Sequence, residues 1–199
     1  MTSEAMMLSD ADLHSLRLDL AERSMWNIGY FVAGCVLWLA IFAAGQMLPL
    51  DDARFVWIAA TFFTLPVAVA ASKAFKADPF CRDNPLGNLV GYTHMSVISL
   101  SLPVVIMLSL IDPEAQLLAM AILYCIDFYV MSWAFGSGLF GVHAAVRTAL
   151  VTAIWFAAPQ LRLSVLPLAV AGLYLLTVPA ILVLRRSWLA GHRANRSEC

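Results

Sequence analysis

The stretch that decides the fold is YCIDFYVMSWAFGSGLFGVHAAVR, residues 124–147. Two apolar runs flank a Gly-Ser-Gly turn, with Asp127 ten residues before Ser137 and Arg147 ten residues after it. If the two runs form antiparallel helices, a rise of 1.5 Å per residue places each charge about 15 Å from the turn. We therefore expect Asp127 and Arg147 to meet at one depth of a helical hairpin.

The composition around this hairpin is that of a membrane protein. Of the 199 residues, 62% are hydrophobic and 13% are charged, and the mean hydropathy is +0.82. A soluble domain is about half apolar and about one quarter charged. The net charge of −1 offers no electrostatic basis for binding nucleic acid. We predict an integral membrane protein whose partners are membrane lipids, with no nucleic-acid partner.

Six apolar runs are each long enough for a helix that crosses a hydrocarbon core of about 30 Å. They lack the alternation of a membrane-spanning barrel. The prediction is an all-α membrane protein, a six-transmembrane-helix bundle with a short N-terminal amphipathic helix. The expected parts are an N-terminal segment with that helix (1–26), a transmembrane domain (27–184) and a basic tail (185–199). The expected spans are 27–48, 55–72, 86–111, 115–135, 139–158 and 165–184.

The distribution of Lys and Arg predicts the orientation. Positive residues concentrate on the cytoplasmic side of membrane proteins. Nine of them fall on the side that carries both termini and the loop after the second span, and two fall on the other side. Both termini should therefore face the cytoplasm. The nine are Arg17, Arg23, Lys73, Lys76, Arg82, Arg185, Arg186, Arg193 and Arg196, and the two are Arg54 and Arg162.

Ionisable and polar residues inside the spans form the candidate site. A charge at mid-helix costs about 2.5–3.5 kcal/mol on insertion scales, so such residues face protein or water. Tyr124 shares a helix face with Asp127, and His143 shares one with Arg147. His94 follows Gly87 and Gly91 on one face of the third span. The candidate ligand-binding residues are therefore Asp127, Arg147, His94, His143 and Tyr124.

Two interpretations of this cluster stay open. In the structural one, an Asp127–Arg147 ion pair fixes the packing of the fourth and fifth spans, with His94 and Tyr124 completing the hydrogen bonds. In the functional one, the cluster lines a polar cavity that opens to the cytoplasm. That cavity would bind an anionic or zwitterionic ligand through Arg147, or relay protons through a histidine, whose charge changes near neutral pH.

The motifs of common enzymes and metal sites are missing from the sequence. It has no H-E-x-x-H or G-x-S-x-G, and its four cysteines have no metal-ligand spacing. Cys81, beside Lys76 and Arg82, is the only cysteine in a loop between spans, and it is either a reactive thiol or an ordinary reduced one. We predict no catalytic residues, no cofactor and no metal.

The octapeptide NPLGNLVG, residues 84–91, follows the second span and a short basic loop. With the hydropathy profile, it resembles a family of small uncharacterised bacterial multi-pass membrane proteins. The resemblance spans about residues 15–184 and implies a bacterial inner-membrane location. It implies no activity, because the family has none assigned.

Three functions follow from these observations. The first is a small transporter or binding protein for a small solute or a lipid headgroup. The second is a structural or accessory membrane subunit in which the cluster only holds the bundle together. The third and weakest is an intramembrane lipid-modifying enzyme. The sequence gives no indication of a homo-oligomer.

Overall fold

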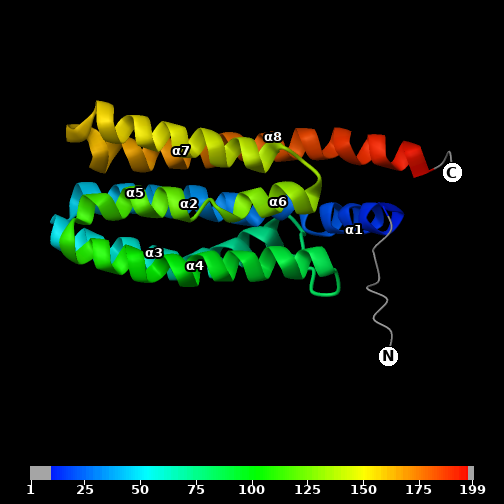
Figure 1. Cartoon of the computed structure of the whole chain (residues 1–199), viewed down its shortest axis with the longest axis horizontal. Helices are drawn as coiled ribbons and strands as arrows, with labels where there is room; N and C mark the ends of the chain where they lie inside the picture. Colours follow the sequence, from blue (N-terminus) through cyan, green and yellow to red (C-terminus); the bar gives the residue numbers. More distant parts are fainter. Residues whose placement is uncertain (1–9, 197–199) are drawn as a thin grey trace, which may run out of the picture.

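The structure is a computed structural model that describes residues 10–196, with side chains described from residue 12 to residue 191. Within this range every regular element is a helix, and the helices lie along one long axis (Figure 1). The elements are α1 (Asp10–Arg23), η1 (Met25–Asn27), α2 (Ile28–Met47), α3 (Leu50–Ala74), α4 (Pro85–Ile111), α5 (Pro113–Leu123), α6 (Asp127–Phe135), α7 (Leu139–Ala157), η2 (Pro159–Leu161) and α8 (Arg162–Arg196).

Six helical segments of the described chain are long and apolar enough to cross a membrane, which confirms the predicted number. The second runs over Leu50–Ala74 and starts earlier than expected. Asp51 and Asp52 lie in its first turn, where acidic side chains interact favourably with the helix dipole. The sixth runs over Pro159–Gly191 and extends past the expected end at residue 184.

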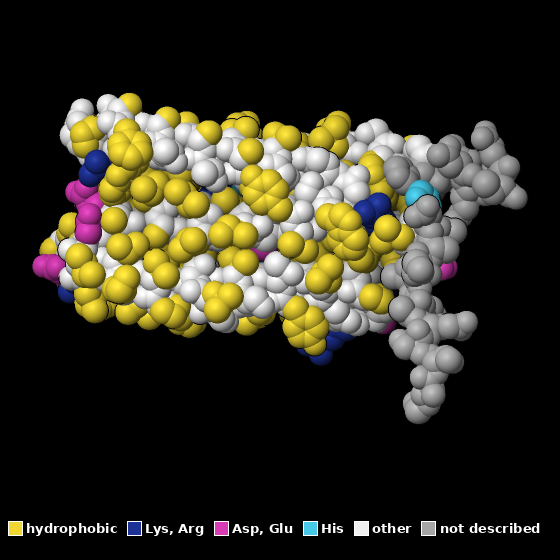
Figure 2. Space-filling model, viewed as in Figure 1, with side chains coloured by type: hydrophobic (Ala, Val, Ile, Leu, Met, Phe, Trp, Pro, Cys, Tyr) yellow, Lys and Arg dark blue, Asp and Glu magenta, His cyan; other side chains and the backbone are white. Residues whose placement is uncertain are grey.

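The bundle has three tiers in Figure 1. The pair α7 and α8 lies on one side, the pair α3 and α4 on the opposite side, and α2, α5 and α6 between them. The helix α1, the turn between α6 and α7, and the loop between α3 and α4 share one end of the bundle, which we call the α1 end. The face of the bundle in Figure 2 is largely hydrophobic along its length, and acidic side chains gather at the end opposite the α1 end.

The predicted N-terminal helix exists and packs against the bundle. Leu20 is buried, whereas Leu13 and Leu16 are partly buried against the core. The helix contacts α4, α6 and α8. The link from α1 to α2 turns through three consecutive left-handed residues, Met25–Asn27. This turn inserts Trp26 into an aromatic group with Phe135, Phe140 and Trp188. The amphipathic character of α1 stays a prediction.

Candidate functional site

The fourth span is broken where we expected a continuous helix over 115–135. α5 ends at Leu123 and α6 begins at Asp127, with turns between them. Across this break the backbone N–H groups of Cys125 and Ile126 donate to carbonyls three residues back, at 3.3 Å each, instead of four. The Cys125 thiol donates to the Ile122 carbonyl at 3.0 Å. Non-helical backbone at membrane depth is tolerated only where it is enclosed by protein or lines a cavity.

The break places Asp127 at the start of α6, in contact with α4. Its Oδ2 lies 2.6 Å from Nδ1 of His94. The Asp127 side chain is 2% exposed and the His94 side chain is 18% exposed. A carboxylate in the first turn of a helix interacts favourably with the partial positive charge there. The second carboxylate oxygen, Oδ1, and Nε2 of His94 have no hydrogen-bond partner among the described residues.

Arg147 has different neighbours. Its guanidinium donates to the Tyr174 hydroxyl at 2.6 Å and to the Met120 carbonyl at 3.5 Å. It also lies 5.4 Å from the ring centroid of Trp38 and 5.2 Å from that of Tyr174. The side chain is fully buried. Met120 lies in the last turn of α5, so Arg147 supplies positive charge at the partially negative end of that helix.

The expected Asp127–Arg147 ion pair is therefore not formed between the described side chains. Because Asp127 begins a separate helix, its carboxylate meets α4, whereas Arg147 on α7 meets α8 and the end of α5. The two charges lie at the two sides of the helix break. Each complements the helix end nearest to it, and they do not pair with each other.

The other two predicted residues make separate contacts. Nδ1 of His143 lies 2.7 Å from the Thr177 hydroxyl. Since that hydroxyl donates to the Leu173 carbonyl at 2.7 Å, His143 is the donor to it. The Tyr124 hydroxyl lies 3.2 Å from the Thr61 hydroxyl on α3. Among the five predicted residues, polar contacts between described side chains thus join one pair directly, His94 and Asp127.

A cavity of about 70 Å³, counted as space for the centres of water-sized molecules, lies beside the helix break. His94, Tyr124 and Asp127 line it, whereas Arg147 and His143 do not. At the α1 end its wall is made by Leu20 and by the loop before α4. Its volume exceeds the 10–15 Å³ or so that one water needs. Residues from α2, α3, α6 and α8 also line it, among them Tyr30, Gly34, Trp38, Thr61, Phe128 and Tyr174.

The contribution of α2 was not predicted from the sequence. One face of α2 carries three residues spaced four apart, Tyr30, Gly34 and Trp38. None of the three is charged, so the sequence offered no reason to select them. A Cβ at Gly34 would lie 2.5 Å from the Tyr174 ring. The missing side chain at Gly34 therefore lets Tyr174 pack against α2 and reach Arg147.

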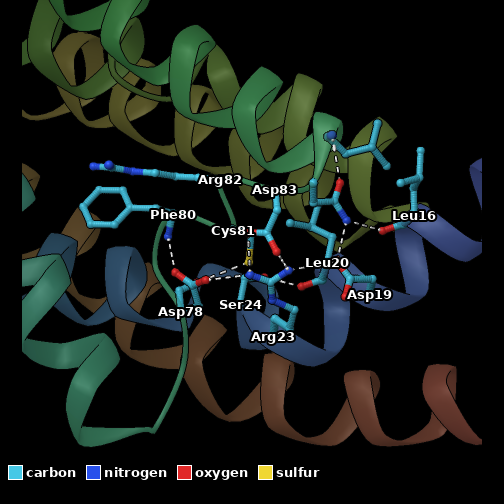
Figure 3. A network of polar contacts seen from close by, with 12 residues as sticks. Leu16, Asp19, Leu20, Arg23, Ser24, Asp78, Phe80, Cys81, Arg82 and Asp83 are labelled. Atoms are coloured by element: carbon cyan, nitrogen blue, oxygen red, sulfur yellow. Dashed lines mark hydrogen bonds and ion pairs between the residues drawn. The ribbon is translucent and has the colours of Figure 1, made fainter.

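At the α1 end, the loop that lines the cavity is held by Arg23 (Figure 3). The guanidinium of Arg23 donates to Asp83 at 2.8 and 3.0 Å and to Asp78 at 3.0 Å. The Asp78 N–H donates to the Arg23 carbonyl at 2.8 Å. The Asn84 amide, which also caps α4, donates to Asp19 at 2.8 Å and to the Leu16 carbonyl at 2.9 Å. We call the Arg23–Asp78–Asp83 contacts the latch.

Charges and burial in the latch set the protonation of its groups. The hydrogen bond from Arg23 lowers the pKa of Asp83, and hydrogen bonds to the Asp83 and Asp78 carboxylates raise the pKa of Arg23. For Asp78, partial burial opposes ionisation, but backbone N–H donors and Arg23 outweigh it and lower the pKa. Burial, followed by the charge of Asp78, raises the pKa of the Cys81 thiol to about 12. Cys81 is therefore an ordinary protonated thiol, not the reactive one.

The described residues hold no group of three His, Cys, Asp or Glu side chains that could bind a metal ion. What they define is an all-helical bundle with six helical segments apolar enough to cross a membrane, the fourth of which is interrupted beside a cavity. The chain belongs to a family of unknown function (DUF7010), whose model matches residues 13–184. No curated protein and no solved structure matches the chain.

Proposed function

We propose that the protein binds a small solute in the cavity beside the α5–α6 break and carries it across a membrane. The observation that carries this proposal is the His94–Asp127 pair, which lines the cavity and leaves Asp127 Oδ1 and His94 Nε2 without partners. Ionisable residues inside a membrane mark substrate and ion pathways and are candidate functional sites by default. The proposed location is a bacterial inner membrane with both termini in the cytoplasm.

The interrupted span supports this proposal. Transporters place their binding sites near the bilayer midplane at discontinuous helices, whose free ends contribute partial charges. Here the N-terminal end of α6 lies at Asp127, and the cavity runs from there to Phe80 and Cys81 at the α1 end. The latch would then hold the cytoplasmic opening closed, and release of Arg23 would open it.

A structural role remains the second candidate, and Arg147 is the observation in its favour. That side chain is enclosed by Tyr174, Trp38 and the end of α5, and it does not line the cavity. We assign Arg147 to holding the break together. The solute site then consists of His94, Asp127, Tyr124 and their cavity neighbours.

Thiol labelling tests the proposal without knowledge of the solute. A single cysteine replaces Val97, which lines the cavity on α4, in a chain without other cysteines that is reconstituted in vesicles. A membrane-impermeant thiol reagent is then applied to each face of the membrane in turn. We expect labelling from both faces, faster from the side of the termini. Labelling from one face only would leave a binding site without transport, and labelling from neither would leave the structural role.

A further inference from the structure

Among the described residues, the cavity wall includes a single carboxylate group. Asp127 supplies it, and no Lys or Arg is found among the described residues that line the cavity. The nearest candidate cation, Arg147, is separated from the cavity by contacts with Tyr174 and Trp38, which themselves line it. A ligand with a positive charge is therefore favoured over an anion.

The unpartnered atoms of His94 and Asp127 indicate which kind of cation would bind. A neutral His94 that donates its Nδ1–H to Asp127 keeps a bare lone pair on Nε2, and Asp127 Oδ1 is an acceptor as well. Buried acceptors without a donor are costly, and charged ones are more so. A ligand that carries N–H donors would satisfy them. A quaternary ammonium has none.

The rest of the wall is apolar and aromatic. Tyr30 and Phe128 lie next to the pair: the Tyr30 ring packs against the His94 ring at 5.0 Å, and Phe128 follows Asp127 in α6. The faces of aromatic rings attract cations. Val90, Val97 and Ile98 on α4 complete a surface that suits a short hydrocarbon chain.

From this geometry we infer that the cavity binds a small alkylammonium ion, with its N–H groups donating to Asp127 and its chain lying against α4. The inference rests on the proposed function and names the solute class. The same ammonium chemistry occurs in free alkylamines and in the headgroup of phosphatidylethanolamine, and the experiment separates these two sources.

Gly91 provides a way to block the cavity without touching its polar groups. It lines the cavity, lies on the α4 face that carries Gly87 and His94, and a Cβ there would meet nothing within 4 Å. Gly172 in α8 is the matched control, because a Cβ there also meets nothing within 4 Å and it does not line the cavity. Since a side chain at either position starts in open space and glycine is the less favourable residue within a helix, folding should tolerate substitution at both.

The test measures binding of n-butylammonium to the purified full-length protein by calorimetry, in nanodiscs of phosphatidylcholine. Butanol, butyrate and tetramethylammonium are the neutral, anionic and donor-free comparisons. We expect butylammonium to bind at least tenfold more tightly than any of the three. Binding should be lost in Asp127→Asn and Gly91→Phe, reduced in Gly91→Leu, and kept in Gly91→Ala and Gly172→Phe.

Nanodiscs that contain phosphatidylethanolamine separate the two sources. If the aminolipid is the natural ligand, it should weaken butylammonium binding severalfold, and a free amine as natural ligand predicts no change. Equal binding of butanol or butyrate, or full binding by a folded Asp127→Asn protein, would overturn the inference. If these results came with labelling of Val97→Cys from both faces, the proposed transport function would stand and only the solute class would fall.

Discussion

At the scale of single residues, the pairing of Asp127 is the central result. We predicted that Asp127 pairs with Arg147 because both were expected at the same depth. In the structure, Asp127 instead contacts His94 on α4. The reason is local, since the turn at 124–126 ends α5 and lets Asp127 start α6 facing α4. Each charge is instead matched to a helix end.

This pairing predicts that an exchange of the two charges fails. In Asp127→Arg with Arg147→Asp, His94 would lose its carboxylate partner and aspartate would face the Met120 carbonyl, another acceptor, so neither site would regain its polar contacts. We expect the double variant to be no more stable than either single variant, as measured by thermal unfolding of the purified proteins. Restoration of wild-type stability by the double variant would show that the two residues form the pair after all.

The Tyr174 hydroxyl offers a milder test of the site of Arg147. Tyr174→Phe keeps the ring and removes the acceptor of a 2.6 Å bond from a fully buried guanidinium. We expect a loss of about 1–3 kcal/mol in the free energy of unfolding, because a buried charged donor loses its partner. Tyr129→Phe on α6, whose side chain is exposed, is the control and should change little. Equal effects of the two substitutions would contradict this assignment.

At the scale of elements, the break between α5 and α6 and the loop before α4 control the cavity. The first places Asp127 in the cavity wall, and the second lines the α1 end of the cavity. Arg23 connects α1 to that loop through the latch, and Arg82 points away from it toward Phe80, 5.2 Å from that ring (Figure 3).

Release of the latch should expose Cys81. Its thiol is buried and its pKa is raised to about 12, first by burial and then by Asp78, so alkylation at neutral pH should be slow. We expect Arg23→Gln to speed alkylation of Cys81 severalfold, measured by mass spectrometry with a maleimide. Arg82→Gln should leave the rate unchanged. An unchanged rate in Arg23→Gln would mean that the latch does not hold the loop.

The latch should also give stability a defined pH dependence. The folded pKa values of Asp78 and Asp83 lie below the ordinary value of about 4, so the stability they contribute is complete above that value. It is lost as the pH falls through their lowered folded values. The difference in unfolding temperature between wild type and Arg23→Gln should therefore be constant from pH 7 to 5 and shrink below pH 4. A difference that persists at pH 2 would rule out ionic contacts as its source.

At the scale of the whole molecule, hydropathy was sufficient to predict six spans and an all-helical bundle. Those features depend on long apolar runs, which any single sequence displays. The break in the fourth span was not predicted, because Tyr124, Cys125 and Ile126 include neither glycine nor proline. Only Asp127, an acidic residue at what proved to be a helix start, gave a sign of it.

The charged and polar residues of the candidate site could be predicted from the sequence. The residues that line the cavity because of helix packing could not. We predicted His94, Asp127 and Tyr124, which line the cavity, as candidates because polar and ionisable groups are costly inside a membrane. The sequence offered no sign of Tyr30 or Trp38, whose place in the cavity follows from how α2 packs against α3 and α8. It also could not show that Tyr174 would separate Arg147 from the cavity.

The central claim is that the cavity beside Asp127 is reached from outside the protein. The most direct measurement is the rate at which a thiol reagent modifies Val97→Cys in three proteins. The first has no other substitution in the cavity, the second also carries Gly91→Phe, and the third carries Gly172→Phe instead. We expect rapid modification when Gly91 is kept, including in the Gly172→Phe protein, and a rate at least tenfold slower in the Gly91→Phe protein. Equal rates in all three proteins, or no modification in any, would contradict the claim.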